Sequence, residues 1–99
     1  MAFVCKIDEL KPGSAKRVVV DGTPIAVFNL NGEYLALDDI CSHALASLSE
    51  GFIEDDFVEC PKHGSEFDLR TGQPRSLPAT KPVATHPIRL EDDEIHVEV

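Results

Sequence analysis

The sequence has few basic residues. Nine Lys and Arg stand against 18 Asp and Glu among 99 residues, so the formal net charge is −9. This charge excludes a nucleic acid as a partner, because its phosphates would repel the chain. Two interpretations of the acidic excess stay open: it steers the chain toward a basic protein partner, or it only keeps the chain soluble.

Long apolar stretches are also missing. No run reaches the length of a membrane span, and the first residues carry charge at Lys6, Asp8 and Glu9, where a signal peptide would be apolar. We therefore expect a cytoplasmic protein that does not associate with a membrane. Repeats, low-complexity segments and linkers are absent too, so residues 1–99 are expected to form a single domain and a monomer.

Helical patterns are equally scarce, because no segment has the apolar spacing and length of a substantial helix. Short apolar runs alternate instead with turn residues, and Asn31-Gly32 is the strongest hairpin signal. The expected strands cover residues 3–7, 17–20, 25–30, 34–37, 51–53, 57–59, 65–68, 85–90 and 94–99. This pattern predicts an all-β protein with a β-sandwich or barrel-like base.

The chain also lacks the signatures of common enzymes. It contains no hydrolytic triad, phosphate-binding glycine loop or dinucleotide fingerprint, and no sign of a substrate pocket, flavin site or mononuclear iron triad. We therefore do not expect an enzyme. Any catalysis would belong to partner proteins.

Cysteine is scarce, and the three in the chain cannot all pair internally. Without an export signal, reduced thiols are expected, and these are available to bind a metal. Two of them are followed closely by a histidine, in Cys41-Ser42-His43 and in Cys60-Pro61-Lys62-His63. Pro61 and Gly64 bracket the second pair, and such turn residues let a short loop bend both side chains toward one point.

Two thiolates and two imidazoles form the ligand set of a Rieske-type [2Fe–2S] centre, where histidines replace cysteines on one iron. The same donors also suit a structural zinc site. The spacing counts against zinc, because structural zinc sites usually place Cys beside Cys and His beside His. Electron transfer is therefore the leading hypothesis, and a structural zinc module is its competitor.

The sequence resembles the Rieske ferredoxins of multicomponent aromatic-ring-hydroxylating dioxygenases, whose motif is C-x-H, a spacer and C-x-x-H. Residues 44–59 match the length of the family's spacer. The likeness continues through Leu48-Ser49-Glu50-Gly51, Val58-Glu59-Cys60-Pro61 and Phe67-Asp68-Leu69-Arg70-Thr71-Gly72, and it covers nearly the whole chain.

This resemblance implies one [2Fe–2S] cluster, with Cys41 and Cys60 on the inner iron and His43 and His63 on the outer iron. It also implies an antiparallel β-sandwich base with a smaller cluster-binding subdomain inserted at roughly residues 40–82. The chain would then be a soluble one-electron carrier between an NAD(P)H-dependent flavoprotein reductase and the Rieske centre of a terminal aromatic-ring oxygenase. An accessory subunit of another reductase, or a redox sensor, is the alternative within the same family.

The chain departs from the related Rieske subunits of respiratory complexes. Those subunits carry a disulfide between the cluster loops, where this chain has Ala46 and Lys62. Their serine near the cluster is matched by Ser65, but their tyrosine is replaced by Phe67. Because hydrogen bonds to cluster sulfur raise the potential, we expect a midpoint at the low end of the range of about −150 to +300 mV.

Several other residues receive separate interpretations. Leu77-Pro78-Ala79, with Pro82 shortly after, matches the family's third loop, which covers the cluster. Cys5 has apolar neighbours and no nearby histidine, so it is expected to be a small buried core residue. His86 and His96 lack companion ligands and are expected to be surface or paired residues rather than metal ligands.

Overall fold

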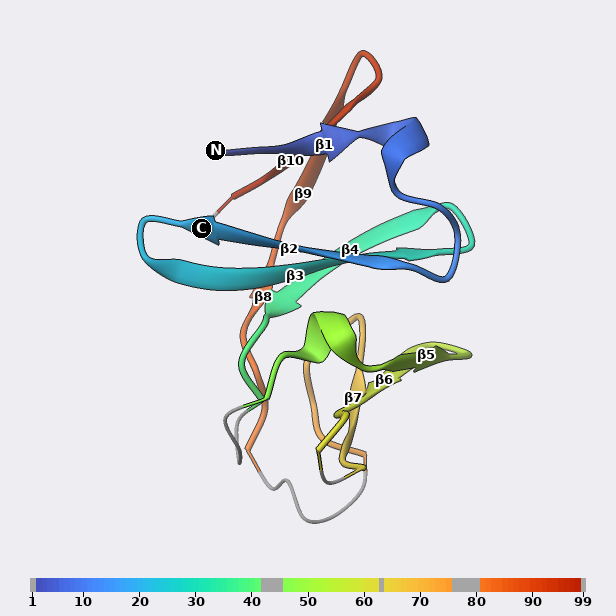
Figure 1. The fold of residues 1–99 in the computed structure, drawn as a ribbon, viewed down its shortest axis with the longest axis vertical. Helices are drawn as coiled ribbons and strands as arrows, with labels where there is room; N and C mark the ends of the chain where they lie inside the picture. Colours follow the sequence, from blue (N-terminus) through green and yellow to red (C-terminus); the bar gives the residue numbers. More distant parts are fainter. Residues whose placement is uncertain (1, 42–45, 63, 76–80, 99) are drawn as a thin grey trace.

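The computed structural model describes residues 2–41, 46–62, 64–75 and 81–98, and Figure 1 shows the arrangement of its elements. The base contains β1 (Ala2–Lys6), β2 (Ala15–Val20), β3 (Thr23–Leu30), β4 (Glu33–Asp38), β8 (Thr85–His86), β9 (Ile88–Glu91) and β10 (Glu94–Val97). Below it in Figure 1 lie β5 (Phe52–Glu54), β6 (Phe57–Glu59) and β7 (Glu66–Asp68). Among the described residues the only helical elements are two 3-10 turns, η1 (Ile7–Glu9) and η2 (Leu48–Glu50).

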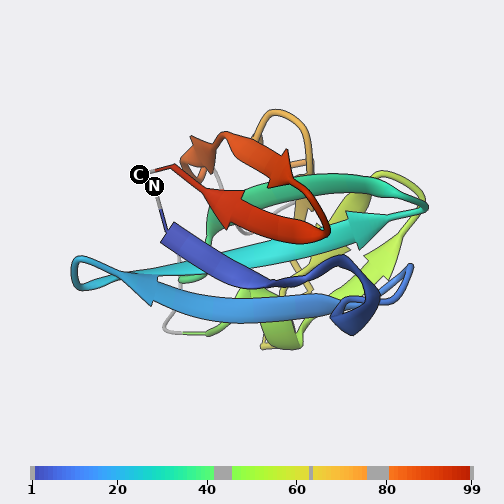
Figure 2. The ribbon, with the colours of Figure 1, turned by 90° about the horizontal axis from the view of Figure 1, so that it is seen from above.

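The strands form three antiparallel sheets. Their orders are β2-β3-β4-β8, β1-β10-β9 and β5-β6-β7. The first two sheets stack on each other and make up the base, as Figure 2 shows from above, and β5-β6-β7 is the smaller third sheet. The predicted all-β class and the antiparallel sandwich base are therefore confirmed.

Strand β3 is the centre of the fold, because both of its faces are buried. Successive side chains of a strand point to opposite faces of the sheet. Ile25 and Val27 accordingly pack with β1 and β10 between the two base sheets. Ala26, Phe28 and Leu30 face the other way, into a second core that is shared with the small sheet. The base sheet is therefore covered on both sides, which explains the continuous apolar run in β3.

The second core joins the base to the small sheet. From the base it contains Phe28 and Leu37, and from the small sheet Val58 and Phe67, all of them fully buried. Cys41 and Cys60 belong to this same core. Cys5 belongs to the other core, on the far side of β3.

The predicted hairpin at Asn31-Gly32 is confirmed. Leu30 pairs with Glu33 across it, and both turn residues have positive φ, 53° at Asn31 and 95° at Gly32. These values are the backbone angles of the tight turns that asparagine and glycine favour.

One predicted strand was wrong. Residues 85–90 do not form a single strand, because Pro87 separates β8 from β9. Proline has no N–H to donate to a strand ladder, so the pairing changes at this residue. Strand β8 pairs with β4, whereas β9 pairs with β10 in the other base sheet. Ile7, the last residue of the first predicted strand, belongs instead to η1.

The part of the chain that the structure describes contains no helix long and apolar enough to cross a membrane.

Candidate metal centre

Cys41 and Cys60 each lie just beyond the end of a strand. Cys41 follows β4 by three residues, and Cys60 follows β6 directly. Their side chains are buried, with 3% and 1% of the residue surface exposed, and neither forms a disulfide. Two cysteines that form no disulfide therefore lie in one packed core, where the base meets the small sheet.

The backbone N–H groups of the two cysteines make equivalent hydrogen bonds. The N–H of Cys41 donates to the carbonyl oxygen of Ala46 at 2.9 Å, and the N–H of Cys60 donates to the carbonyl oxygen of Ser65 at 2.7 Å. Each of these hydrogen bonds thus joins a cysteine at the start of a loop to the residue five positions later. Backbone hydrogen bonds close both loops, as expected for a chain that lacks the respiratory disulfide.

Each loop also continues an antiparallel ladder. An isolated bridge pairs Ile40 with Ser47 just before the first closure, and β6 and β7 pair Glu59 with Glu66 just before the second. Gly64, with a φ of 74°, donates its N–H to the carbonyl oxygen of Cys60 at 3.1 Å. The strand ladders therefore hold both cysteines on rigid supports.

The surroundings of the cysteines fit an iron–sulfur cluster. Thiolates are soft ligands that suit iron–sulfur centres, and both cysteines lack a disulfide and belong to one core with Leu48 and Phe67. Ser65 is fully buried beside this core, at the position where the respiratory relatives have their hydroxyl group. Phe67 is fully buried as well, and its ring provides no hydroxyl.

The other two predicted ligands, His43 and His63, lie outside the described residues. The predicted cluster-covering loop Leu77-Pro78-Ala79 lies outside them too, whereas Pro82 is described and exposed. Within the described ranges, no group of three or more Cys, His, Asp or Glu residues could hold a metal ion. Of the four predicted ligands, the structure therefore describes Cys41 and Cys60.

The interpretations of the remaining Cys and His residues are confirmed. Cys5 is 3% exposed in the far core, where burial, as the main cause, raises the pKa of its thiol above the ordinary value of 9.0. His86 pairs with Asp38, Nε2 to Oδ1 at 2.8 Å, and His96 pairs with Glu94, Nε2 to Oε1 at 3.1 Å.

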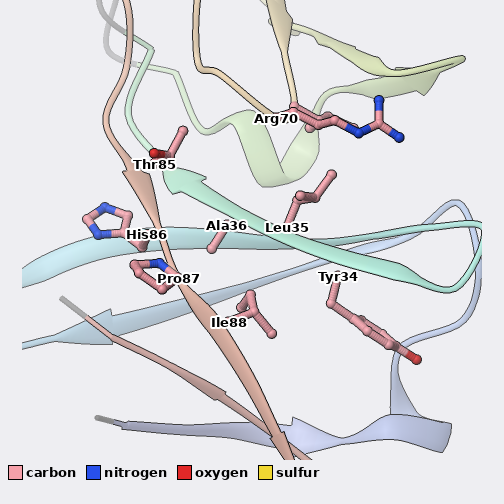
Figure 3. Close-up of a pocket in the computed structure, with 9 residues that line it drawn as sticks. Tyr34, Leu35, Ala36, Arg70, Thr85, His86, Pro87 and Ile88 are labelled. Carbon is pink, nitrogen blue, oxygen red and sulfur yellow. The ribbon is translucent and has the colours of Figure 1, made fainter.

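A pocket of about 330 Å³ lies beside the β8–β9 junction, and Figure 3 shows its lining. Its walls include Leu35 and Ala36 of β4, Thr85 and His86 of β8, and Arg70. Neither Cys41 nor Cys60 lines it. Among the described residues, the pocket therefore does not include the two proposed cysteine ligands.

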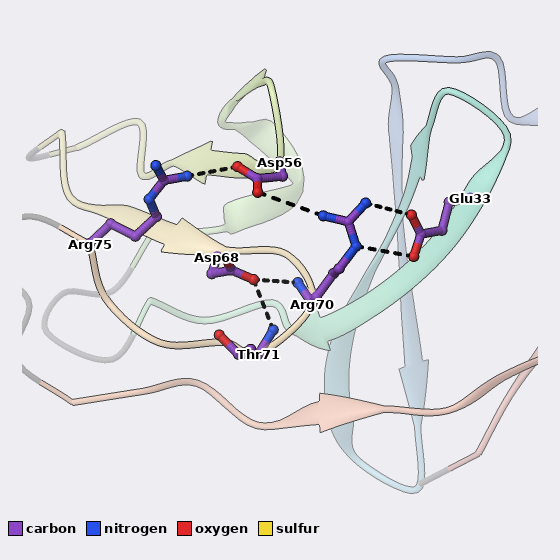
Figure 4. A network of polar contacts seen from close by, with 6 residues as sticks. All are labelled: Glu33, Asp56, Asp68, Arg70, Thr71 and Arg75. Atoms are coloured by element: carbon purple, nitrogen blue, oxygen red, sulfur yellow. Dashed lines mark hydrogen bonds and ion pairs between the residues drawn. The ribbon is translucent and has the colours of Figure 1, made fainter.

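A network of charged side chains ties the small sheet to the base, as Figure 4 shows. Arg70 binds Glu33 of β4 through two hydrogen bonds, at 2.7 and 3.3 Å, and also lies 3.6 Å from Asp56. Asp56 in turn accepts a hydrogen bond from Arg75 at 2.8 Å. The hydrogen bond to Glu33 raises the pKa of Arg70 above its ordinary value.

Asp39, a charged residue close to Cys41 in the chain, was not singled out from the sequence. Asp39, two residues before Cys41, is completely buried and pairs with Arg17 of β2, with Oδ2 3.0 Å from Nε. Its position beside another aspartate does not predict burial, because charged side chains usually remain exposed.

Comparison with known proteins agrees with this arrangement. A family model described as the Rieske [2Fe-2S] domain matches residues 1–87. The 3-phenylpropionate/cinnamic acid dioxygenase ferredoxin subunit of Photorhabdus laumondii is 48% identical over 99 residues, which cover 98% of this chain and 92% of that one.

Two solved structures show the same fold. The ferredoxin of carbazole 1,9a-dioxygenase from Nocardioides aromaticivorans superposes with a TM-score of 0.92 at 36% identity, covering 96% of this chain and 93% of that chain. A ferredoxin-type chain in the complex of reduced oxygenase and oxidised ferredoxin in carbazole 1,9a-dioxygenase gives a TM-score of 0.92 at 38% identity, covering 96% and 89%.

Proposed function

Because the chain belongs to the Rieske [2Fe–2S] domain family, we propose that it is the ferredoxin component of a multicomponent aromatic-ring dioxygenase. In this role it carries one electron at a time and does not itself catalyse the oxygenation. The observation that carries the proposal is the pair of buried cysteines, Cys41 and Cys60, which form no disulfide and lie in a single core, one just after an isolated β-bridge and the other at the end of a strand ladder.

We propose Cys41 and Cys60 as the ligands of one iron and His43 and His63 as the ligands of the other. When bound, the [2Fe–2S] cluster supplies a one-electron redox couple. The subdomain that holds it spans roughly residues 40–82 within the single domain 1–99. Cys41 and Cys60 exclude water from the inner side of the site, because both are at most 3% exposed and pack against apolar side chains.

The exposure of the residues that follow Cys60 supports electron exchange with partners. Cys60 is 1% exposed, yet Pro61, Lys62 and Gly64, which follow it closely, are all exposed. A buried ligand that is followed directly by exposed residues keeps water from the thiolate while the chain next to it stays accessible to a partner protein. We therefore place the docking face at the end of the molecule that carries the cysteine loops, opposite the β1-β10-β9 sheet (Figure 1).

We propose two protein partners for this chain. Carbazole 1,9a-dioxygenase has been solved as a complex of its oxygenase with a ferredoxin, so we propose a terminal oxygenase as the electron acceptor. A flavoprotein reductase that oxidises NAD(P)H is the proposed donor, because a one-electron carrier needs a partner that splits a hydride into single electrons. We further propose that the chain acts as a monomer in the cytoplasm.

The test begins with protein purified without air and reduced with dithionite. Electron paramagnetic resonance should show the low average g value of a histidine-ligated [2Fe–2S] centre, with iron and acid-labile sulfide in equal amounts. Cys41→Ser and Cys60→Ser should each abolish the signal, whereas Cys5→Ser, the matched control in the far core, should retain it. A colourless protein that contains stoichiometric zinc and no sulfide would instead establish the structural zinc module.

A second experiment separates the carrier from an accessory subunit or a sensor. The reduced protein is mixed with the oxidised terminal oxygenase, and reduction of the oxygenase is followed by its visible absorbance. Fast, complete transfer, sustained by NADH and the reductase, is the expected result. Slowing by added salt would favour steering by the acidic surface, and no effect of salt would favour the solubility interpretation.

A further inference from the structure

Asp39 is the most deeply buried carboxylate among the described residues, with no exposed surface. Both of its side-chain oxygens have partners. Oδ2 accepts a hydrogen bond from Nε of Arg17 at 3.0 Å, and Oδ1 accepts one from the backbone N–H of Ser49 at 2.9 Å. A buried carboxylate without such partners would be strongly unfavourable, so these contacts hold it in place.

These contacts connect three segments of the fold. Arg17 lies on β2 at the edge of the base sheet, and Ser49 lies in η2 beyond the first cysteine loop. The main chain of Asp39 adds further ties, since its carbonyl oxygen accepts from the N–H of Leu48 at 2.7 Å and its N–H donates to Pro24 at 3.0 Å. Asp39 therefore fastens the entry of the Cys41 loop to its exit and to the base.

The main chain of Asp39 also lies close to that of Cys41, a proposed ligand of the cluster. Two peptide units separate its Cα from that of Cys41, so the two atoms are at most about 7.6 Å apart. Inside a protein, a charge at this range acts strongly on another charge, because little water screens it. Arg17 is the counter-charge, but its side chain is 46% exposed and solvent screens it more than it screens Asp39.

We propose that Asp39 is a positioning residue of the metal centre, and that its buried charge, balanced by Arg17, lowers the reduction potential of the cluster. This proposal rests on the proposed function, because it needs the cluster to be held by Cys41. The carboxylate holds the first cysteine loop in one conformation, and its negative charge opposes the arrival of an electron. Arg17 partly offsets this opposition.

The test compares the midpoint potentials of the cluster-loaded wild type and three variants, measured by redox titration under visible absorbance. Asp39→Asn removes the negative charge and should raise the midpoint, changing the ratio of reduced to oxidised protein at a fixed potential by about threefold or more. Arg17→Gln removes the counter-charge and should lower it. A merely structural loosening of the loop would move both variants in the same direction.

Asp38→Asn is the matched control. Asp38 precedes Asp39 in the sequence, but its side chain is 36% exposed and pairs with His86 instead. Solvent screening should keep its shift below half of that of Asp39→Asn. Arg17→Gln alters a half-exposed side chain, so it keeps the proposal testable if Asp39→Asn does not fold.

The possible outcomes distinguish this inference from the proposed function on which it rests. Opposite shifts in Asp39→Asn and Arg17→Gln support the charge pair. Equal potentials, or shifts of the same sign, in proteins with a normal cluster overturn the inference and leave the proposed function intact. A wild type that binds no cluster overturns both. Amide hydrogen exchange of the metal-free protein adds an independent readout: the N–H of Ser49 should exchange faster in Asp39→Ala than in wild type.

Discussion

Arg70 binds Glu33 side-on across 37 residues of sequence, with Nη2 2.7 Å from Oε1 and Nε 3.3 Å from Oε2. Glu33 begins β4 of the base, and Arg70 follows β7 of the small sheet. The pair therefore links the part of the molecule that carries Cys60 to the sheet that supports it. Asp56 extends the link to Arg75, which also stacks on the ring of Phe57 at 4.7 Å.

Removing this pair should weaken the protein only slightly, because both side chains are about half exposed and solvent screens their attraction. We expect Arg70→Gln and Glu33→Gln each to lower the unfolding temperature by a few degrees at most, and the difference from wild type to shrink in high salt. The raised pKa of Arg70 means that the folded protein holds the guanidinium proton up to a higher pH than the unfolded chain does, so this charge is fully present at neutral pH and is lost only in strongly alkaline solution. Calorimetry of the double variant is the control: equal losses in single and double variants indicate a coupled pair, and additive losses contradict it.

Gly72 should be much harder to replace than Gly13. Both have positive φ, 76° and 81°, but a Cβ on Gly72 would collide with the carbonyl oxygen of Val83, whereas a Cβ on Gly13 meets open space. Gly13→Ala should therefore cost only the backbone strain, about 1 kcal/mol. Gly72→Ala should cost about 3 kcal/mol or more, because Val83 belongs to the core that contains both cysteines. Urea unfolding measures both, and equal costs would show that the main chain at Val83 moves aside freely.

Phe67→Tyr should raise the midpoint potential of the bound cluster. Phe67 is fully buried in the core of Cys41 and Cys60, at the position where respiratory relatives have a tyrosine. A hydroxyl that donates to cluster sulfur stabilises the negative charge gained on reduction. Ser65→Ala should move the midpoint in the opposite direction, because Ser65 is also fully buried beside this core. Redox titration tests both, with Phe57→Tyr, on the neighbouring strand and stacked on Arg75, as the control that should not shift.

Alkaline pH should destabilise the protein through Cys5. Burial raises the pKa of this thiol above 9.0, so the unfolded chain loses the proton at a lower pH than the folded chain does. The stabilising effect is therefore fully present below pH 9.0 and decreases as pH rises from there toward the folded pKa. Cys5→Ala should lack this part of the pH dependence. Urea unfolding of the metal-free proteins between neutral pH and pH 9.0 or above measures it, and parallel curves for the two proteins would contradict the assignment.

Removing the cluster should loosen one core and spare the other. The core between the base sheets contains Val27 and Ile95 and neither proposed ligand, whereas the second core contains Cys41, Cys60 and Phe67. In metal-free protein, amide exchange should therefore accelerate at Cys60 and Phe67 while Val27 and Ile95 stay protected. Nuclear magnetic resonance on holo and apo samples provides the comparison. Uniform acceleration across both cores would show that the base does not hold its structure without the metal.

Part of the fold could be read directly from the amino acids. Asn31-Gly32 predicts its hairpin because few other residues tolerate the positive φ of the turn. The apolar run of β3 predicts a strand, and the spacing of Cys41 and Cys60 with their histidines predicts the ligand set. These signals are local, since each depends on neighbouring residues and the backbone angles they prefer. The strand break at Pro87 was also local, and the missing N–H of proline was the signal to use.

Other properties depend on which segments meet in space. Nothing in the sequence distinguishes Asp38, which is partly exposed beside His86, from Asp39, which is fully buried beside Arg17. The two side chains differ in burial because adjacent side chains at the end of a strand point to opposite sides of the sheet. Only the packing of the sheets determines which of these sides faces the core. The sequence alone thus predicted the proposed metal ligands and determined the class of fold. The tertiary structure decided which of the two neighbouring carboxylates is buried, because burial and long-range pairing arise only when distant segments pack together.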